Sequence, residues 1–188
     1  MQRCDWCGED PLYVEYHDTE WGVPERDSRA LWEKLTLEGF QAGLSWITIL
    51  RKRENFRAAF AGFDPDIVAN WGEEDVKRLL QDPGIVRHRG KIEATISNAR
   101  AWQQIEAEQG FAQFLWAYVN DTPLQPNRRN HSDLPAQTLL SKQISKDLKA
   151  AGFRFCGPTT VYAFMQAAGL VNDHQVSCFR HAEVTAMA

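Results

Sequence analysis

The sequence predicts an all-α fold, and three features of the chain lead to this prediction. Apolar residues recur at helical spacing along most of its length, as Ile92, Ile96 and Ala99 do in one segment. Residues that cap helices stand just before several of these segments. No segment shows the regular alternation of apolar and polar residues that is typical of a half-buried strand.

The first predicted helices lie in the N-terminal third of the chain. Asp27 and Ser28 are candidate caps for a helix with an apolar face over residues 31–37. Ser45 is placed to cap a second helix, whose first turns over 46–50 are also apolar. These two helices flank a glycine-rich corner, so we expect the chain to turn sharply between them.

Two more predicted helices follow in the middle of the chain. Asp64 before Pro65 combines a cap residue with a proline at the first helical position, which indicates a helix start. Residues 73–81 carry apolar positions at helical spacing, and the Asp-Pro-Gly turn at 82–84 ends that helix.

The C-terminal half continues the pattern with one interruption. Long and short helices are predicted over 91–108 and 111–119, and a further one over 138–151 that ends at Gly152. Residues 121–135 hold three prolines among polar side chains, which indicates an exposed loop. We expect one domain, or two small lobes that share a core, because no long linker divides the chain.

Composition narrows the class of protein. The 188 residues are 44% hydrophobic, and no apolar run approaches the length of a membrane span. The polar N-terminus carries no signal-peptide pattern, so we expect a cytoplasmic protein whose four cysteines stay reduced. A net charge of −4 argues against a general nucleic-acid coat protein, although local basic stretches can still bind phosphate.

Soft metal ligands gather at the two ends of the chain. Zinc prefers thiolate and imidazole ligands, and two of each form a closed tetrahedral site. Spacing alone leaves the ligand set open, since Cys7 forms a Cys-x-x-Cys pair and His181 follows three residues after the last candidate cysteine. The main candidates are Cys4, His17, His174 and Cys178.

A short glycine-bounded turn over 152–159 joins two predicted helices. Pro158 suits the first turn of the second helix, and free amides at a helix start attract anions. Lys142, Lys149 and Arg154 are close in sequence. This pattern indicates a DNA-phosphate site, while a plain helical hairpin with solvated lysines is the alternative.

The N-terminal third also holds one conspicuous carboxylate, Glu38. It follows an apolar helical face and precedes the glycine corner, so it is a candidate for an interior position. Aromatic rings around such a carboxylate would bind a flat, positively charged ring. The alternative is that the rings are core and Glu38 lies at the surface. The aromatic candidates are Trp6, Tyr13, Tyr16, Trp21 and Trp46.

Short motifs occur in a fixed order along the chain, and together they carry a family resemblance. They are Arg3-Cys4, residues 10–13, Tyr16-His17-Asp18, residues 20–24, Leu37-Glu38-Gly39, residues 41–48, 52–55 and 85–92, Gly152-Phe153 and residues 169–174. This order resembles the 3-methyladenine DNA glycosylase I family, the constitutive bacterial alkylation-repair enzymes. The resemblance covers residues 3 to about 178, and such a collinear set is far more specific than any single motif.

The resemblance implies a helix-hairpin-helix DNA glycosylase fold over residues 1–188, with two helical lobes and the base pocket between them. It implies one structural zinc per chain, which clasps the terminal segments and excludes Cys7. It also implies a base pocket and a phosphate-binding turn. The implied zinc ligands are Cys4, His17, His174 and Cys178; the implied pocket residues are Glu38, Tyr16, Trp46, Trp6, Tyr13, Trp21 and Leu44; the phosphate-binding residues are Gly152, Arg154, Gly157 and Thr159.

The implied reaction is hydrolysis of the N-glycosidic bond of 3-methyladenine in double-stranded DNA, with 3-methylguanine as a second candidate substrate. The implied enzyme acts as a monomer, away from membranes, and releases the free base. Methylation at N3 makes the base a cation, so Glu38 is expected to recognise the charge rather than to donate a proton. Two other classes share part of this pattern. A zinc hydrolase or deaminase needs an open coordination position, and a non-catalytic zinc-clasped DNA-binding module leaves the aromatic box unexplained.

Overall fold

The computed structural model describes residues 1–187, and Ala188 lies outside the described residues. Over the described range the regular elements are all helices, and a single isolated parallel bridge joins Leu124 to Val171. The predicted all-α class is confirmed. None of the helices in this range has the length and apolarity needed to cross a membrane.

The α-helices are α1 (Pro11–Thr19), α2 (Ser28–Gln41), α3 (Trp46–Ala59), α4 (Pro65–Val68), α5 (Glu73–Leu80), α6 (Arg89–Glu108), α7 (Phe111–Trp116), α8 (Leu139–Ala150), α9 (Pro158–Ala167) and α10 (Phe179–Thr185). Short 3₁₀ helices are η1 (Asp5–Cys7), η2 (Ala61–Phe63), η3 (Ala117–Val119) and η4 (His131–Asp133).

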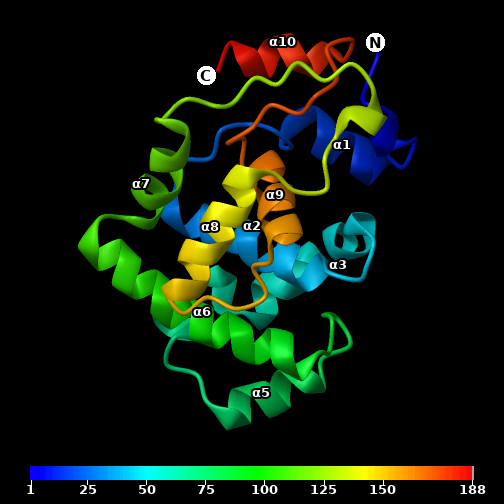
Figure 1. Ribbon diagram of the computed structural model, residues 1–188. Helices are drawn as coiled ribbons and strands as arrows, with labels where there is room; N and C mark the ends of the chain where they lie inside the picture. The colour runs from blue at the N-terminus through cyan, green and yellow to red at the C-terminus, as the bar shows by residue number, and fades with distance from the viewer. Residues whose placement is uncertain (188) are drawn as a thin grey trace.

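Helix α2 lies at the centre of the molecule and packs against α9, α3, α6 and α7 (Figure 1). Its buried residues run from Leu31 through Phe40, so nearly every face of its second half is covered. A helix surrounded in this way is forced to bury whatever polar side chains it carries. Glu38 is one of them, and the fold therefore removes this carboxyl from bulk water.

Several predicted helix starts are confirmed, with the cap residue now identified. The Asp27 carboxylate accepts hydrogen bonds from the Arg29 and Ala30 amides, so Asp27 rather than Ser28 is the cap. Asp64 caps α4 in the same way. Ser45 occupies the cap position of α3, but its hydroxyl bonds to Thr48 instead of to a free amide.

Two helices were not predicted from the sequence. Helix α1 begins with Asp10 before Pro11, the same signature that predicted α4, and the Asp10 carboxylate accepts from the Leu12 amide at 3.0 Å. Helix α10 is short and follows Cys178 directly. Figure 1 shows it beside the N-terminus, where the Phe179 amide donates to the Gln2 carbonyl at 3.0 Å.

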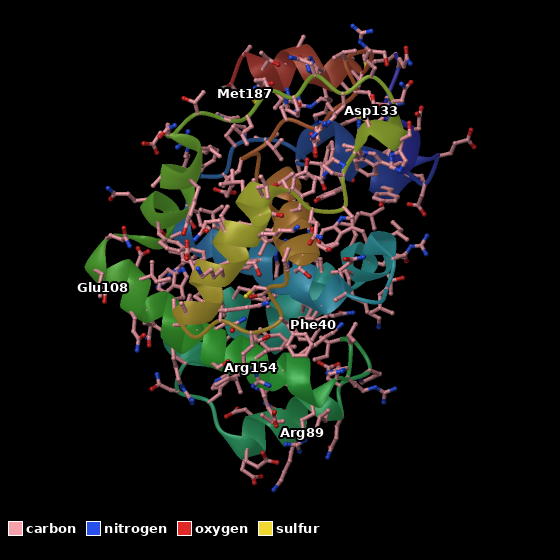
Figure 2. All side chains as sticks on the ribbon, in the orientation of Figure 1. Phe40, Arg89, Glu108, Asp133, Arg154 and Met187 are labelled. Carbon is pink, nitrogen blue, oxygen red and sulfur yellow. The ribbon has the colours of Figure 1, made fainter. Side chains whose placement is uncertain are left out.

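The segment predicted as an exposed loop is largely exposed, but it is not detached from the core. We call residues 121–138 the strap. The Leu124 amide donates to the Leu170 carbonyl at 2.9 Å, and the Val176 amide donates to the Arg128 carbonyl at 2.8 Å. The strap therefore follows the C-terminal segment across the molecule, from α7 towards the N-terminal helices (Figure 1). Figure 2 shows its Asp133 beside those helices.

Candidate base pocket and metal cluster

A cavity of about 210 Å³ opens beside the second half of α2. A water molecule occupies about 30 Å³ of liquid, so the cavity can hold several waters or one bicyclic base. Its walls come from η1, α1 and the turn that follows it, α2, α3, the strap and α9. The lining residues are Trp6, Tyr13, Tyr16, Trp21, Glu38, Gln41, Trp46, His131, Leu134, Ala163 and Gln166.

Six of the seven residues expected in the pocket line this cavity. The exception is Leu44, which is 39% exposed in the turn between α2 and α3 and does not line the cavity. Helices α1 and α3 bring Tyr16 and Trp46 together, with ring centroids 5.5 Å apart and planes inclined by 44°. Trp6 of η1 completes the aromatic wall, 5.0 Å from the Tyr13 ring.

The Glu38 carboxyl is the polar centre of the cavity. The residue is only 5% exposed, and its carboxyl has no hydrogen-bond partner among residues 1–187. Burial raises the pKa of Glu38 to about 8, and the nearby Lys34 ammonium opposes this rise only in part. Lys34 itself donates to Glu20 at 2.9 Å. At pH 7 the buried Glu38 carboxyl is therefore mainly the neutral acid.

Sequence reasoning missed one side of the pocket. His131 and Leu134 come from the strap, and Ala163 and Gln166 come from α9. The sequence around His131 and Leu134 gives no local signal for a pocket, because the strap reaches the cavity only through its hydrogen bonds to distant segments. Gln166 could have been noticed, since it is a polar residue one turn after Tyr162 in a mainly apolar stretch of α9.

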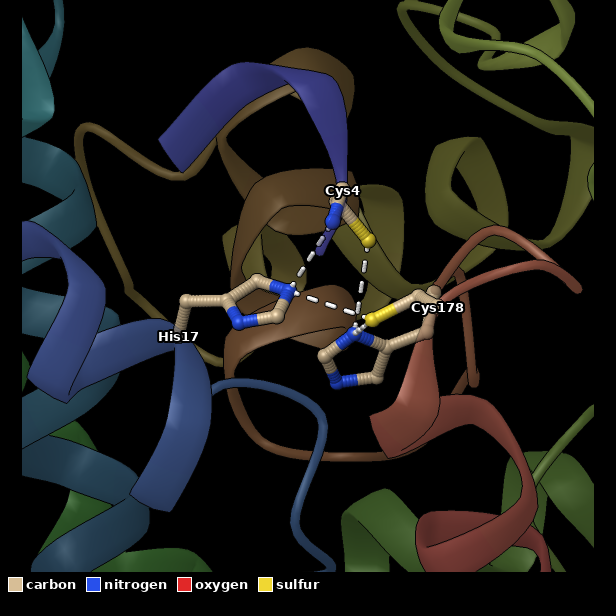
Figure 3. Close-up of side chains that lie close together, drawn as sticks. Cys4, His17 and Cys178 are labelled. Atoms are coloured by element: carbon tan, nitrogen blue, oxygen red, sulfur yellow. Dashed lines mark hydrogen bonds between the residues drawn. The ribbon is translucent and has the colours of Figure 1, made fainter. Parts of the chain in front are cut away.

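The four expected soft ligands meet in one buried cluster. Cys4, His17, His174 and Cys178 each offer one ligand atom, and these atoms all lie within 4.8 Å of one another. Figure 3 shows Cys4, His17 and Cys178 pointing toward a common centre. The Cys4 Sγ lies 3.5 Å from His174 Nδ1, and the Cys178 Sγ lies 3.5 Å from His17 Nε2. Zinc bonds of about 2.3 Å to sulfur and 2.0–2.1 Å to nitrogen require sulfur–nitrogen edges of about 3.5 Å in a tetrahedron.

Outer hydrogen bonds orient both imidazoles for such a role. The second nitrogen of His17, Nδ1, lies 2.7 Å from Asp18 Oδ1, and that of His174, Nε2, lies 2.9 Å from the Trp21 carbonyl. Each bond leaves the other ring nitrogen free as a ligand, as is usual for metal-bound histidine. Hydrogen bonding from Cys4, His17 and His174 lowers the pKa of the Cys178 thiol, which favours the thiolate that binds metal.

The two other candidate ligands lie outside the cluster. Cys7 is buried, but its thiol donates to the Cys4 carbonyl at 3.3 Å and belongs to no group of potential ligands. His181 is likewise absent from the cluster. The fold therefore does not bring together the alternative ligand sets, with Cys7 or His181, that the sequence spacing left open.

The cavity and the cluster share a wall. The Trp6 ring lies 5.3 Å from the His17 ring, and the Trp21 ring lies 4.7 Å from the His174 ring, both edge-on. Each of these tryptophans also lines the cavity. The side chains that would hold a metal thus support the rings that would hold a ligand.

The turn between α8 and α9 forms a separate surface. Gly152 adopts a left-handed conformation with φ of +99°, where its amide closes the end of α8. The Arg154 backbone is clamped by Asn98, whose side chain accepts from the Arg154 amide at 2.7 Å and donates to its carbonyl at 3.0 Å. Figure 2 shows Arg154 near Phe40 at the end of α2, so this turn lies close to the helix that carries Glu38.

The predicted phosphate-binding residues lie together on this turn and the start of α9. Arg154 and Thr159 are exposed, and a side chain at Gly157 would meet no atom within 4 Å. Pro158 begins α9 and has no amide hydrogen, while the Thr159 amide lies in the first helical turn and has no intrahelical acceptor. The surface therefore offers open space, free amides and a cationic side chain.

Comparisons with known proteins found a matching family and several similar chains. A family model described as methyladenine glycosylase matches residues 6–181. The chain is 56% identical over 179 residues to DNA-3-methyladenine glycosylase 1 of Escherichia coli (strain K12), covering 95% of this chain and 96% of the relative. A crystal structure of 3-methyladenine DNA glycosylase I is similar with a TM-score of 0.93 at 56% identity, over 95% of this chain and 98% of that one. A structure of a variant of 3-methyladenine DNA glycosylase I in complex with 3-methyladenine has a TM-score of 0.92 at 43% identity, over 95% and 97% of the two chains.

Proposed function

This chain belongs to the methyladenine glycosylase family, and we propose that it performs the family's reaction with the cavity around Glu38. It is a DNA glycosylase that removes 3-methyladenine from alkylated DNA by cleaving the N-glycosidic bond, which initiates base excision repair. The observation that carries the assignment of the site is a buried carboxyl without a partner inside an aromatic cavity.

The cavity chemistry fits a methylated adenine nucleotide. Methylation at N3 places a positive charge on the base, and the faces of tryptophan and tyrosine attract cations. Trp46 and Tyr16 form one wall that can stack on such a ring. Unmodified adenine carries no charge, so this wall and Glu38 together discriminate by charge as well as by shape.

Glu38 would act on the charge of the base rather than as a proton donor. A cation placed beside a carboxyl lowers its pKa, so arrival of the charged nucleotide favours the Glu38 carboxylate over the acid. The carboxylate then stabilises the bound cation and accepts hydrogen bonds from its amino group. The leaving base needs no proton, because its positive charge is neutralised when the glycosidic electrons move onto the ring.

The base must leave the helical stack before it can enter the cavity. Extrusion costs a few kcal/mol, and less for a damaged base. The sugar then passes through an oxocarbenium-like state, which water captures. The turn between α8 and α9 would hold the DNA backbone during this step as the hairpin of a helix-hairpin-helix motif. Its contacts would come from Gly152, Arg154, Gly157 and Thr159.

Zinc is the metal that the cluster would hold. Two sulfurs and two imidazole nitrogens at tetrahedral edge lengths are typical of a structural zinc site. When bound, the metal would supply a cross-link between the first and last segments of the chain. Because Cys4, His17, His174 and Cys178 use all four positions, no open position would remain for a reacting water.

Residues 1–188 would act as a single glycosylase domain, with the base pocket between two helical lobes. The larger buried cluster runs from Leu31 to Val171, and Trp46 packs against both this cluster and a smaller one at the chain ends, which supports a single domain. The substrate would be double-stranded alkylated DNA, and the chain would act as a monomer. 3-Methylguanine remains a second candidate substrate.

Base release from alkylated duplex DNA tests this function. The parent protein should release 3-methyladenine and leave abasic sites, as measured by chromatography of the freed bases. Protein with Glu38→Ala serves as the matched control for contaminating activity. A parent protein that binds this DNA but frees no base would show that it is a binding module instead.

A further inference from the structure

One wall of the cavity contains a side-chain amide whose orientation is fixed by a hydrogen bond to a buried carboxylate. Gln166 of α9 lines the cavity, and its Nε2 donates to Asp173 Oδ2 at 2.9 Å. Asp173 is only 1% exposed. A carboxylate accepts hydrogen bonds and offers none, so the amide nitrogen of Gln166 must face Asp173. The Gln166 carbonyl, Oε1, is then the free end of the side chain.

Asp173 is itself held in place by two other donors. Arg128 of the strap donates from Nε to Asp173 Oδ1 at 3.2 Å, and the Tyr162 hydroxyl donates to Asp173 Oδ2. With three donors on one buried carboxylate, rotation of Asp173 would break several hydrogen bonds at once. The Gln166 amide therefore cannot turn over to present its nitrogen to the cavity.

The free carbonyl has no partner of its own. Gln166 Oε1 makes no hydrogen bond within residues 1–187, and it is not among the fully buried atoms without partners, so it keeps accessible surface on a residue that lines the cavity. A ligand that satisfies this carbonyl must bring a hydrogen-bond donor. On a 3-methyladenine ring the only N–H donors are the two hydrogens of the exocyclic amine.

We propose that Gln166, locked by Asp173, is a specificity-determining residue that accepts a hydrogen bond from the 6-amino group of the base. The inference rests on the proposed function of the cavity and adds a second polar contact to that of Glu38. A 6-oxo base such as 3-methylguanine places a carbonyl against the Gln166 carbonyl, and two acceptors cannot bond. Gln166 thus favours 6-amino over 6-oxo bases.

The test compares two free bases on two variants. Gln166→Met keeps the length of the side chain but removes the carbonyl. Gln103→Met is the matched control, because Gln103 makes the same amide-to-carboxylate bond, with Asp66 at 2.8 Å, on the outer surface of α6. Quenching of tryptophan fluorescence reports binding of 3-methyladenine and 3-methylguanine, since three tryptophans line the cavity.

Gln166→Met should weaken binding of 3-methyladenine roughly three- to tenfold, as expected for one neutral hydrogen bond, and leave 3-methylguanine binding unchanged or tighter. The ratio of the two affinities is the decisive readout, because both bases bind the same folded fraction of a destabilised variant. An unchanged ratio, or a matching change in the Gln103→Met control, overturns the proposal. Failure of the proposed function would look different, because then the parent protein would bind neither base.

Discussion

The cavity and the Cys–His cluster are neighbouring buried polar sites, yet their polar atoms are paired very differently. In the cluster, both imidazoles are oriented by hydrogen bonds, and the Cys4 sulfur accepts from the Gln175 amide at 3.4 Å. In the cavity, Glu38 has no partner, and neither do the indole nitrogens of Trp6 and Trp46. Unpaired buried groups cost folding free energy, so the cavity carries a cost that a bound ligand with matching polar groups would offset.

Asp173 sharpens the contrast because it is a carboxylate as deeply buried as Glu38. Three donors surround Asp173, whereas Glu38 has none. The Asp173 carboxylate therefore stabilises the fold through its hydrogen bonds. The Glu38 carboxyl makes none and is available to a ligand. Substitution of a paired buried group should lower the stability of the folded protein, whereas substitution of the unpaired Glu38 should raise it.

The largest effect is expected in the cluster. Cys178→Ser removes a ligand and should lower the free energy of unfolding by about 4 kcal/mol or more, because metal binding is coupled to folding. Metal analysis and thermal melting measure the loss. Cys7→Ser is the matched control, since Cys7 is also buried near the N-terminus but lies outside the cluster. Release of the metal by Cys7→Ser and not by Cys178→Ser would contradict the ligand assignment.

The second effect concerns stability and pH at Glu38. Its folded pKa of about 8 lies above the ordinary glutamate value of 4.5, so the folded state binds more protons between these two pH values. Stability from this group is therefore full below about pH 4.5 and is lost as pH rises through 8. The free energy of unfolding of Glu38→Gln, relative to that of the parent, should therefore rise by on the order of 4 kcal/mol as the pH is raised from 5 to 9. Urea unfolding at several pH values measures this, and a difference that does not vary with pH would contradict the unpaired state of Glu38.

The third effect is the functional counterpart of the second. Glu38→Gln keeps the shape of the side chain but cannot carry a negative charge. A lost charge-assisted hydrogen bond costs roughly 1.5–3 kcal/mol, or about one to two decades in affinity. The variant should bind free 3-methyladenine more weakly and excise it more slowly, while its affinity for undamaged duplex is unchanged. The recognition role of Glu38 would be falsified if the variant bound and excised the base as well as the parent does.

The smallest effect is expected at the exposed turn between α8 and α9, where unpaired amides are solvated rather than buried. Gly157→Asp adds a negative charge in open space and should weaken duplex binding by about 1 kcal/mol, with the salt dependence typical of phosphate contacts. Gly72→Asp is the control, because a side chain at that position is equally free of contacts. Fluorescence anisotropy with labelled duplex DNA measures both variants, and equal affinities would exclude this surface.

Local signals in the sequence predicted most of the helices, but they did not predict which segments come together to form the walls of the cavity. Caps such as Asp27 and Asp64 act on neighbouring amides, so they can be recognised without knowledge of the fold. Helix α1 has the same local signal, with Asp10 as its cap and Pro11 at its first position. The position of the strap depends on pairing with residues 170–176, which lie far away in sequence, so no local pattern indicates that Leu134 reaches the pocket.

The candidate site likewise has features that could be predicted from the sequence and features that depend on the tertiary structure. Ligand chemistry and family resemblance together predicted the four members of the cluster. Resemblance also predicted Leu44 in the pocket, where the chain instead places it in an exposed turn. The state of Glu38 could not be predicted, because a pKa of about 8 depends on the absence of partners in three dimensions.

The shared wall between cluster and cavity also has a kinetic consequence. Contacts between Cys4 and Cys178 close nearly the whole chain into one loop, and such long-range closure is entropically costly and slow to form. Trp6 and Trp21 pack against the His17 and His174 rings of the cluster. The pocket therefore cannot be complete until the segment that carries His174 and Cys178 has docked. A chain still emerging from the ribosome would carry helices and a partial core but no place for a base. In refolding, the capacity to bind 3-methyladenine should therefore appear after helix formation is complete.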